Sequence, residues 1–142
     1  MNKRLSGVIA AIATPVDEAG APDLARATKL ARYLLDNGCN GLNVLGTTGE
    51  ATSFSREQRM GVMSAYKENK LPLERLMVGT GAAAVADAVA LTRHAAEVGF
   101  AGALLLPRPR PSPPARRNIA GMFCDRWPWS PPVCRGVLER RR

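Results

Sequence analysis

Four short apolar runs recur along the first 106 residues, and an amphipathic segment separates each run from the next. The runs begin near residues 7, 41, 75 and 103, so a strand and a helix repeat about every 30 residues. Alternation of this kind produces right-handed βαβ units and a parallel sheet. Doubly wound sheets and (β/α)₈ barrels both satisfy the pattern.

Local signals place the elements within this repeat. Asp23 is expected to cap the first helix, and Ser55 and Gln58 have the spacing of a capping box at the second. Gly38 and Gly99 are expected just past the ends of the first and third helices. The predicted strands are 7–13, 41–45, 76–78 and 103–106, and the predicted helices are about 23–35, 55–69 and 83–98. Continuous apolar runs such as 7–13 are typical of strands that are buried on both faces.

Two polar loops follow strands at their carboxyl ends, which is where parallel α/β proteins bind ligands. The first is Gly46-Thr47-Thr48-Gly49-Glu50, and the second is Gly79-Thr80-Gly81. Glycines allow a sharp turn with exposed N–H groups, and threonine hydroxyls add donors, so the first loop suits a carboxylate or a phosphate. A plain polar turn is the alternative. No GxGxxG or GxxxxGK[ST] pattern supports a nucleotide site.

Composition changes abruptly after Leu106. Residues 1–106 contain 11 Lys and Arg against 10 Asp and Glu, whereas residues 107–142 contain nine Arg against two acidic residues, with eight of the 11 prolines. We therefore expect a partial α/β domain over 1–106 and a disordered tail over 107–142. A shift of reading frame in a GC-rich gene would produce such a change.

The chain is shorter than the roughly 250 residues that a closed (β/α)₈ barrel takes. Its three cysteines have no CxxC spacing, so we expect no metal site and a reducing, cytoplasmic location. We also expect no cofactor. No run approaches the roughly 18 apolar residues of a membrane span. His94, the single histidine, is expected on an outer helix face rather than as a catalytic base.

Three motifs in register resemble one family. Residues 9–15 (IAAIATP), residues 46–50 (GTTGE) and residues 78–81 (VGTG) are similar to the opening half of the dihydrodipicolinate synthase/N-acetylneuraminate lyase family, over residues 5 to about 106. The resemblance implies a (β/α)₈ TIM barrel truncated to about three and a half β–α units. It also implies a homo-oligomer, most often a tetramer, that condenses or cleaves 2-oxo acids such as pyruvate through a lysine Schiff base.

The resemblance assigns roles to the first loop. Thr48 would hold the carboxylate of the 2-oxo acid through its hydroxyl and its backbone N–H, and Thr47 would join a proton relay with a tyrosine. Gly46 and Gly49 would allow the substrate to approach closely. Glu50 and Gly81 would shape the pocket.

The family's relay tyrosine and Schiff-base lysine lie beyond the matching region, and residues 107–142 contain neither residue type. Lys67 and Lys70 fall at the end of a helix, so they are poor substitutes. The chain alone is therefore predicted to be an inactive lyase fragment, with an undetermined second substrate. Two unpaired sheet edges and an open inner face predict self-association or aggregation. The alternative function is a binding module in which the Arg/Pro/Trp tail takes nucleic acid or proline-recognition domains, although specific nucleic-acid binding is not favoured.

Overall fold

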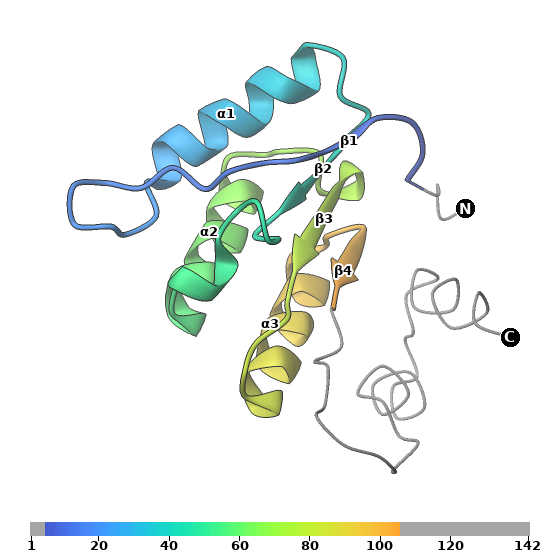
Figure 1. Ribbon diagram of the computed structural model, residues 1–142. Helices are drawn as coiled ribbons and strands as arrows, with labels where there is room; N and C mark the ends of the chain where they lie inside the picture. The colour runs from blue at the N-terminus through green and yellow to red at the C-terminus, as the bar shows by residue number, and fades with distance from the viewer. Residues whose placement is uncertain (1–4, 106–142) are drawn as a thin grey trace, which may run out of the picture. The chain divides into compact units, whose positions relative to one another are not determined.

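The computed structural model describes residues 5–105, and the predictions for the Arg/Pro-rich tail lie outside these residues. The chain divides into two units after Leu104, and only the first is described below. Its elements are β1 (Ile9–Ala11), α1 (Leu24–Asp36), β2 (Gly41–Val44), α2 (Arg56–Glu68), β3 (Leu76–Gly79), α3 (Val85–Val98) and β4 (Gly102–Leu104), with short 3₁₀ turns at Ala51–Ser53 and Leu73–Arg75 (Figure 1).

The four strands form one sheet in the order β1-β2-β3-β4, and every neighbouring pair is parallel. The register pairs Ala11 with Asn43, Asn43 with Met77, and Met77 with Gly102. Laterally paired residues of a sheet share a face, so this line of residues marks one face from edge to edge. The predicted strand–helix alternation and parallel sheet are confirmed.

The helix boundaries follow the predicted local signals. Asp23 accepts a hydrogen bond from the backbone N–H of Arg26 at 2.9 Å, and Ser55 and Gln58 form a complete capping box. Gly38 has φ +103° and Gly99 has φ +107°, which is the left-handed conformation that ends a helix without a Cβ penalty. The starts of α1 and α2 and the ends of α1 and α3 therefore follow from signals local to the sequence, whereas Ala84 at the start of α3 provides no side-chain cap.

The hydrophobic core lies between the sheet and the three helices, which all cover the same face (Figure 1). Leu42, Val44, Leu76 and Val78 alternate along β2 and β3 toward that face, and each is at most 1% exposed. The helices contribute buried residues at helical spacing: Ala27, Ala31 and Leu35 of α1, Val62, Met63 and Tyr66 of α2, and Leu91, Ala95 and Val98 of α3.

The opposite face of the sheet, here called the inner face, is not covered within residues 5–105. Its residues are Ile9, Ala11, Asn43, Met77 and Leu104, which are half-buried except for the exposed Ala11. The prediction that the first apolar run is buried on both faces is therefore wrong for the described part of the chain. The run also forms a shorter strand than predicted, because β1 has a strand neighbour on one side only and ends at Ala11.

Candidate functional site

The two polar loops predicted from the sequence lie side by side at the carboxyl edge of the sheet. Val44 at the end of β2 pairs with Val78 of β3, so the segments that follow these two strands leave the sheet at the same level. A Cβ added to Gly79 would collide with the Leu45 carbonyl and lie 3.1 Å from the Gly46 Cα. Only a glycine at position 79 permits this close contact between the loops.

The turn at residues 46–50 is held by backbone and side-chain hydrogen bonds. The Glu50 N–H donates to the Thr47 carbonyl at 3.1 Å, and the Thr14 hydroxyl donates to the Gly49 carbonyl at 2.8 Å. Thr14 follows β1, so the loops after β1, β2 and β3 all meet here. The turn is a fixed feature of the edge rather than a free loop.

The glycines of this turn do not have the conformation expected of them. Within the described residues, Gly46 and Gly49 do not appear among the positive-φ positions, whereas Leu45 has φ +51° and Glu50 has φ +48°. Gly49 is required instead by packing, since a Cβ there would lie 3.0 Å from the Leu45 nitrogen and 3.1 Å from the Ile12 carbonyl oxygen. The expectation that the glycines supply the sharp turn is therefore wrong.

Leu45 and Glu50 bracket the two threonines in a left-handed conformation that is unfavourable for residues with a Cβ. Such backbone costs about 1–3 kcal/mol per residue and persists where surrounding contacts impose it, often at functional sites. Leu45 is 1% exposed and packed in the core, so the fold fixes the conformation of the residue just before the turn. The threonines are thereby presented in one preset arrangement.

Thr47 and Thr48 are both exposed at this edge. Neither hydroxyl forms a hydrogen bond within residues 5–105, whereas the hydroxyls of Thr14, Thr28 and Thr92 all do. Each threonine hydroxyl can donate one hydrogen bond and accept two. The geometry therefore leaves two adjacent hydroxyls available to an anionic ligand.

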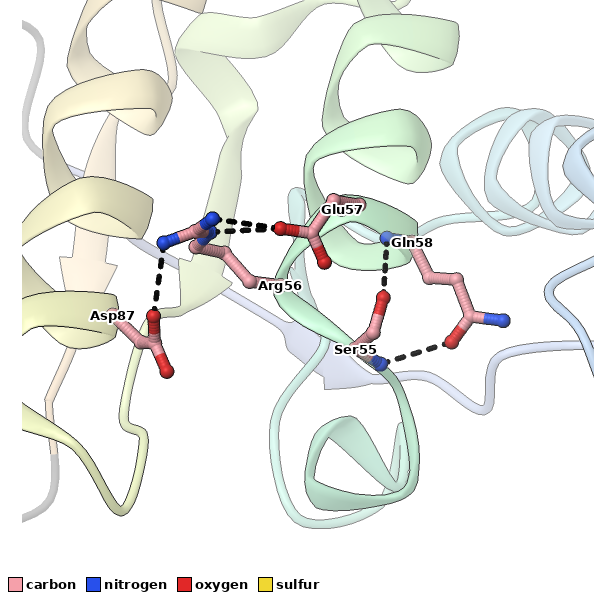
Figure 2. Close-up of polar contacts among 5 residues, drawn as sticks. All are labelled: Ser55, Arg56, Glu57, Gln58 and Asp87. Carbon is pink, nitrogen blue, oxygen red and sulfur yellow. Dashed lines mark hydrogen bonds and ion pairs between the residues drawn. The ribbon is translucent and has the colours of Figure 1, made fainter.

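Helix α2 begins next to this turn, and its first residues link it to α3 (Figure 2). The Arg56 guanidinium contacts the Glu57 carboxylate at 2.8 Å and the Asp87 carboxylate of α3 at 3.1 Å. The hydrogen bond to Glu57, followed by the charges of Glu57 and Asp87, raises the pKa of Arg56. Glu57 has its carboxyl pKa lowered by its own backbone N–H and then by Arg56.

Arg59 was not singled out in the sequence, although it is the most deeply buried charged residue that the structure describes. It is 3% exposed and donates to the carbonyl oxygens of Gly79 at 2.8 Å and Gly81 at 2.9 Å. The Arg59 Nε has no hydrogen-bond partner in the described part of the chain. Burial lowers the pKa of the Arg59 guanidinium, and the nearby negative charge of Asp87 partly offsets this effect. The sequence contains a signal for this burial, because Arg59 is at helical spacing from the buried Val62, Met63 and Tyr66 and so lies on the same face of α2.

The other titratable side chains lie away from this edge. Tyr66 is buried in the core, which raises its phenol pKa, and Tyr33 is exposed on α1. His94 is half-buried and its Nε2 lies 3.1 Å from the Ser64 hydroxyl, so it bridges α3 and α2 instead of facing solvent as expected.

The described lysines are Lys29 on α1, Lys67 in the last turn of α2, and Lys70 just after it. Residues 5–105 contain no group of three His, Cys, Asp or Glu side chains able to hold a metal ion. None of the helices in that range is long and apolar enough to cross a membrane.

A parallel sheet with helices on one face and converging polar loops at its carboxyl edge defines an α/β protein of the kind that builds TIM barrels. The family model for the dihydrodipicolinate synthetase family matches residues 4–114. The chain belongs to this family.

Individual relatives agree with the family match. The chain is 39% identical over 116 residues to 4-hydroxy-tetrahydrodipicolinate synthase of Parasynechococcus marenigrum (strain WH8102), covering 82% of this chain and 38% of the relative. The fold is similar to Proteus mirabilis N-acetylneuraminate lyase, with TM-score 0.67 and 33% identity over 72% of this chain and 35% of that one. It is also similar to the dihydrodipicolinate synthase of Acinetobacter baumannii complexed with pyruvate, with TM-score 0.63 and 34% identity over 72% and 35% of the two chains.

The chain thus spans little more than a third of the length of these relatives. The shared region contains the GTTGE turn and the loops that hold it.

Proposed function

We propose that residues 5–105 form the carboxylate-binding part of a 2-oxo-acid lyase or synthase, and that the 142-residue chain binds pyruvate or a similar acid without reacting with it. The observation that supports this most directly is the pair of exposed threonines without hydrogen-bond partners at the carboxyl edge. The pyruvate complex of a related synthase makes a 2-oxo acid the natural ligand.

Thr48 is the proposed carboxylate ligand. An ionised carboxylate accepts several hydrogen bonds, and a hydroxyl together with a backbone N–H at one residue supplies two fixed donors. Gly46 and Gly49 contribute by keeping the turn free of Cβ atoms against Asn43, Leu45 and Ile12. Preset donors cost no reorganisation when the ligand arrives.

Thr47 is proposed as one member of a proton relay. Forming a Schiff base moves a proton onto the ketone oxygen, which then leaves as water, and a hydroxyl can accept and pass on such a proton. The described tyrosines cannot complete that relay, because Tyr33 lies on α1 and Tyr66 is enclosed in the core. Thr47 is therefore proposed as one member of a proton relay, and the tyrosine of that relay would come from another part of a complete enzyme.

The covalent step needs a lysine whose amine is desolvated next to the bound ketone. Lys67 lies at the carboxyl end of α2, from which the chain returns to the amino end of β3, and its Nζ contacts the Glu97 carbonyl at 3.5 Å. Lys29 and Lys70 likewise belong to the ends or outer faces of helices. The proposed outcome is binding without Schiff-base formation.

The test is pyruvate binding by NMR or calorimetry to the whole chain and to two Thr→Val variants. Thr48→Val removes a hydroxyl but keeps the side-chain shape, and a lost hydrogen bond to a charged group weakens binding about tenfold. Thr52→Val is the matched control, because Thr52 is exposed in the adjacent 3₁₀ turn. Equal binding by both variants, or no binding by the unaltered chain, would contradict the proposal.

The alternative function for the Arg/Pro/Trp tail stays a prediction, because residues 107–142 lie outside the described part of the chain. Aspartate semialdehyde condensation and sugar-acid cleavage would share the turn described here.

A further inference from the structure

Asn43 lies on the inner face of the sheet, shortly before the GTTGE turn. Leu42 and Val44 on either side of it are buried toward the helices, so Asn43, which alternates with them along β2, faces the other way. Since β2 ends at Val44, Asn43 is the last residue of this strand on the inner face. Residues at the carboxyl ends of strands form the ligand sites of parallel α/β proteins, so Asn43 belongs to the same edge as the two exposed threonines.

The Asn43 side chain contributes no hydrogen bond to the described fold. Its Oδ1 is buried without a partner within residues 5–105, and no hydrogen bond of its Nδ2 is found within the same residues. Its neighbours in register, Ala11 of β1 and Met77 of β3, have apolar side chains. An apolar residue of the same shape would avoid the cost of an unpaired amide. Polar residues that do not serve the fold are characteristic of functional sites.

The nitrogen end of the Asn43 amide lies against the turn. A Cβ added to Gly46 would lie 3.0 Å from Nδ2 and 3.7 Å from Oδ1, so Nδ2 is the nearer of the two atoms. The amide nitrogen is a hydrogen-bond donor, whereas an ionised 2-oxo acid at Thr48 presents only acceptors to it. The opposite orientation of the amide would turn an oxygen toward those acceptors. The amide therefore has the orientation that suits an anionic ligand.

We propose that Asn43 donates from Nδ2 to the ketone oxygen of the 2-oxo acid, and thereby selects 2-oxo acids over plain carboxylic acids. The inference rests on the proposed function, in which Thr48 binds the carboxylate. The ketone oxygen is then the acceptor that remains on pyruvate. A donor at this oxygen also fixes the rotation of the acid about the bond between the carboxylate and the ketone, which a carboxylate contact alone leaves free.

The first experiment compares pyruvate with propanoate, which has a methylene group in place of the ketone, by NMR titration of the whole chain. The unaltered chain should bind pyruvate about fivefold more tightly, since one amide–carbonyl hydrogen bond has an effect of this size. Asn43→Leu should bring the ratio of the two dissociation constants close to one, because leucine has a similar shape and no donor. Thr48→Val should weaken the binding of both acids and keep the ratio.

Urea unfolding of the same variants separates a ligand contact from a structural role. Asn43→Leu should keep or raise the urea midpoint, because it removes an amide that is unpaired in the described fold. Asn40→Leu is the matched control, since it is the same substitution just before β2, where the Asn40 Oδ1 accepts the Val8 N–H at 2.9 Å. Asn40→Leu should lower the midpoint and leave the ratio of the two acids unchanged.

The outcomes separate this inference from the proposed function. Binding of both acids without discrimination by the unaltered chain, or a ratio that persists in Asn43→Leu, would overturn the role of Asn43 alone. A lower urea midpoint in Asn43→Leu would also overturn it, because the amide would then serve the fold. If neither acid binds to the unaltered chain, both the proposed function and the role of Asn43 are overturned.

Discussion

Replacing Arg59 tests the central structural contact behind the candidate site. Its guanidinium is 3% exposed and joins α2 to the loop after β3 through Gly79 at 2.8 Å and Gly81 at 2.9 Å. Arg59→Met leaves both carbonyls without this donor but removes a buried charge. Arg59→Lys retains the charge and loses the fork that reaches two acceptors.

The magnitudes predict that the Arg59→Lys variant is less stable than the Arg59→Met variant. A hydrogen bond from a charged donor contributes about 1.5–3 kcal/mol, while a buried cation costs several kcal/mol unless it is fully hydrogen-bonded. Arg59→Met should therefore reduce the free energy of unfolding by about 1–3 kcal/mol, since the two effects partly cancel. Arg59→Lys should reduce it further, because the cost of the buried charge remains.

The assay is urea unfolding followed by circular dichroism, at one fixed protein concentration because association shifts apparent stability. Arg26→Met is the control, since the Arg26 side chain is 72% exposed and its ion pair with Asp23 lies at the surface. That change should stay within about 0.5 kcal/mol. A lysine variant more stable than the methionine variant would refute the reasoning, because the site would then require only a positive charge.

Two further predictions follow from backbone strain and from charge at a helix terminus. Lys70 is exposed with φ +54°, so Lys70→Gly should raise the free energy of unfolding by about 0.5 kcal/mol, measured by urea unfolding, whereas Lys70→Ala should give no gain. The carboxyl pKa of Glu57 is lowered by its own backbone N–H and then by Arg56. The ionised carboxylate therefore stabilises the folded state at pH values above the usual glutamate pKa of 4.5, and this contribution is lost as the pH falls below 4.5. Glu57→Gln should therefore flatten the acid side of a stability profile, and an unchanged profile would contradict the assignment.

The helices could be predicted because their signals are local. Asp23 and the Ser55–Gln58 pair satisfy backbone N–H groups within three residues of themselves, and Gly38 and Gly99 adopt the conformation that their positions require. The parallel sheet followed from the repeat alone. These features depend on spacing, which a sequence displays directly.

The geometry of the candidate site could not be predicted from the sequence, because it depends on contacts between residues that are distant along the chain. The sequence identified the GTTGE turn, but the left-handed backbone falls on Leu45 and Glu50 rather than on the glycines. The packing of Gly49 against Ile12, and of Gly79 against Leu45, appears only when the strands are side by side. The role of Arg59 likewise depends on where the loop after β3 lies.

We propose that the chain binds the carboxylate end of a 2-oxo acid, and that no lysine within residues 5–105 lies where it could bond the ketone. The most direct test is the intact mass of the chain after incubation with pyruvate and borohydride, with a complete 4-hydroxy-tetrahydrodipicolinate synthase treated in parallel. Borohydride reduces a Schiff base to a stable amine, so the complete enzyme should gain one reduced pyruvate if it forms that intermediate. We expect an unchanged mass for this chain under conditions in which NMR detects pyruvate at Thr48. A pyruvate adduct on any of the four lysines, Lys3, Lys29, Lys67 or Lys70, would contradict the proposal.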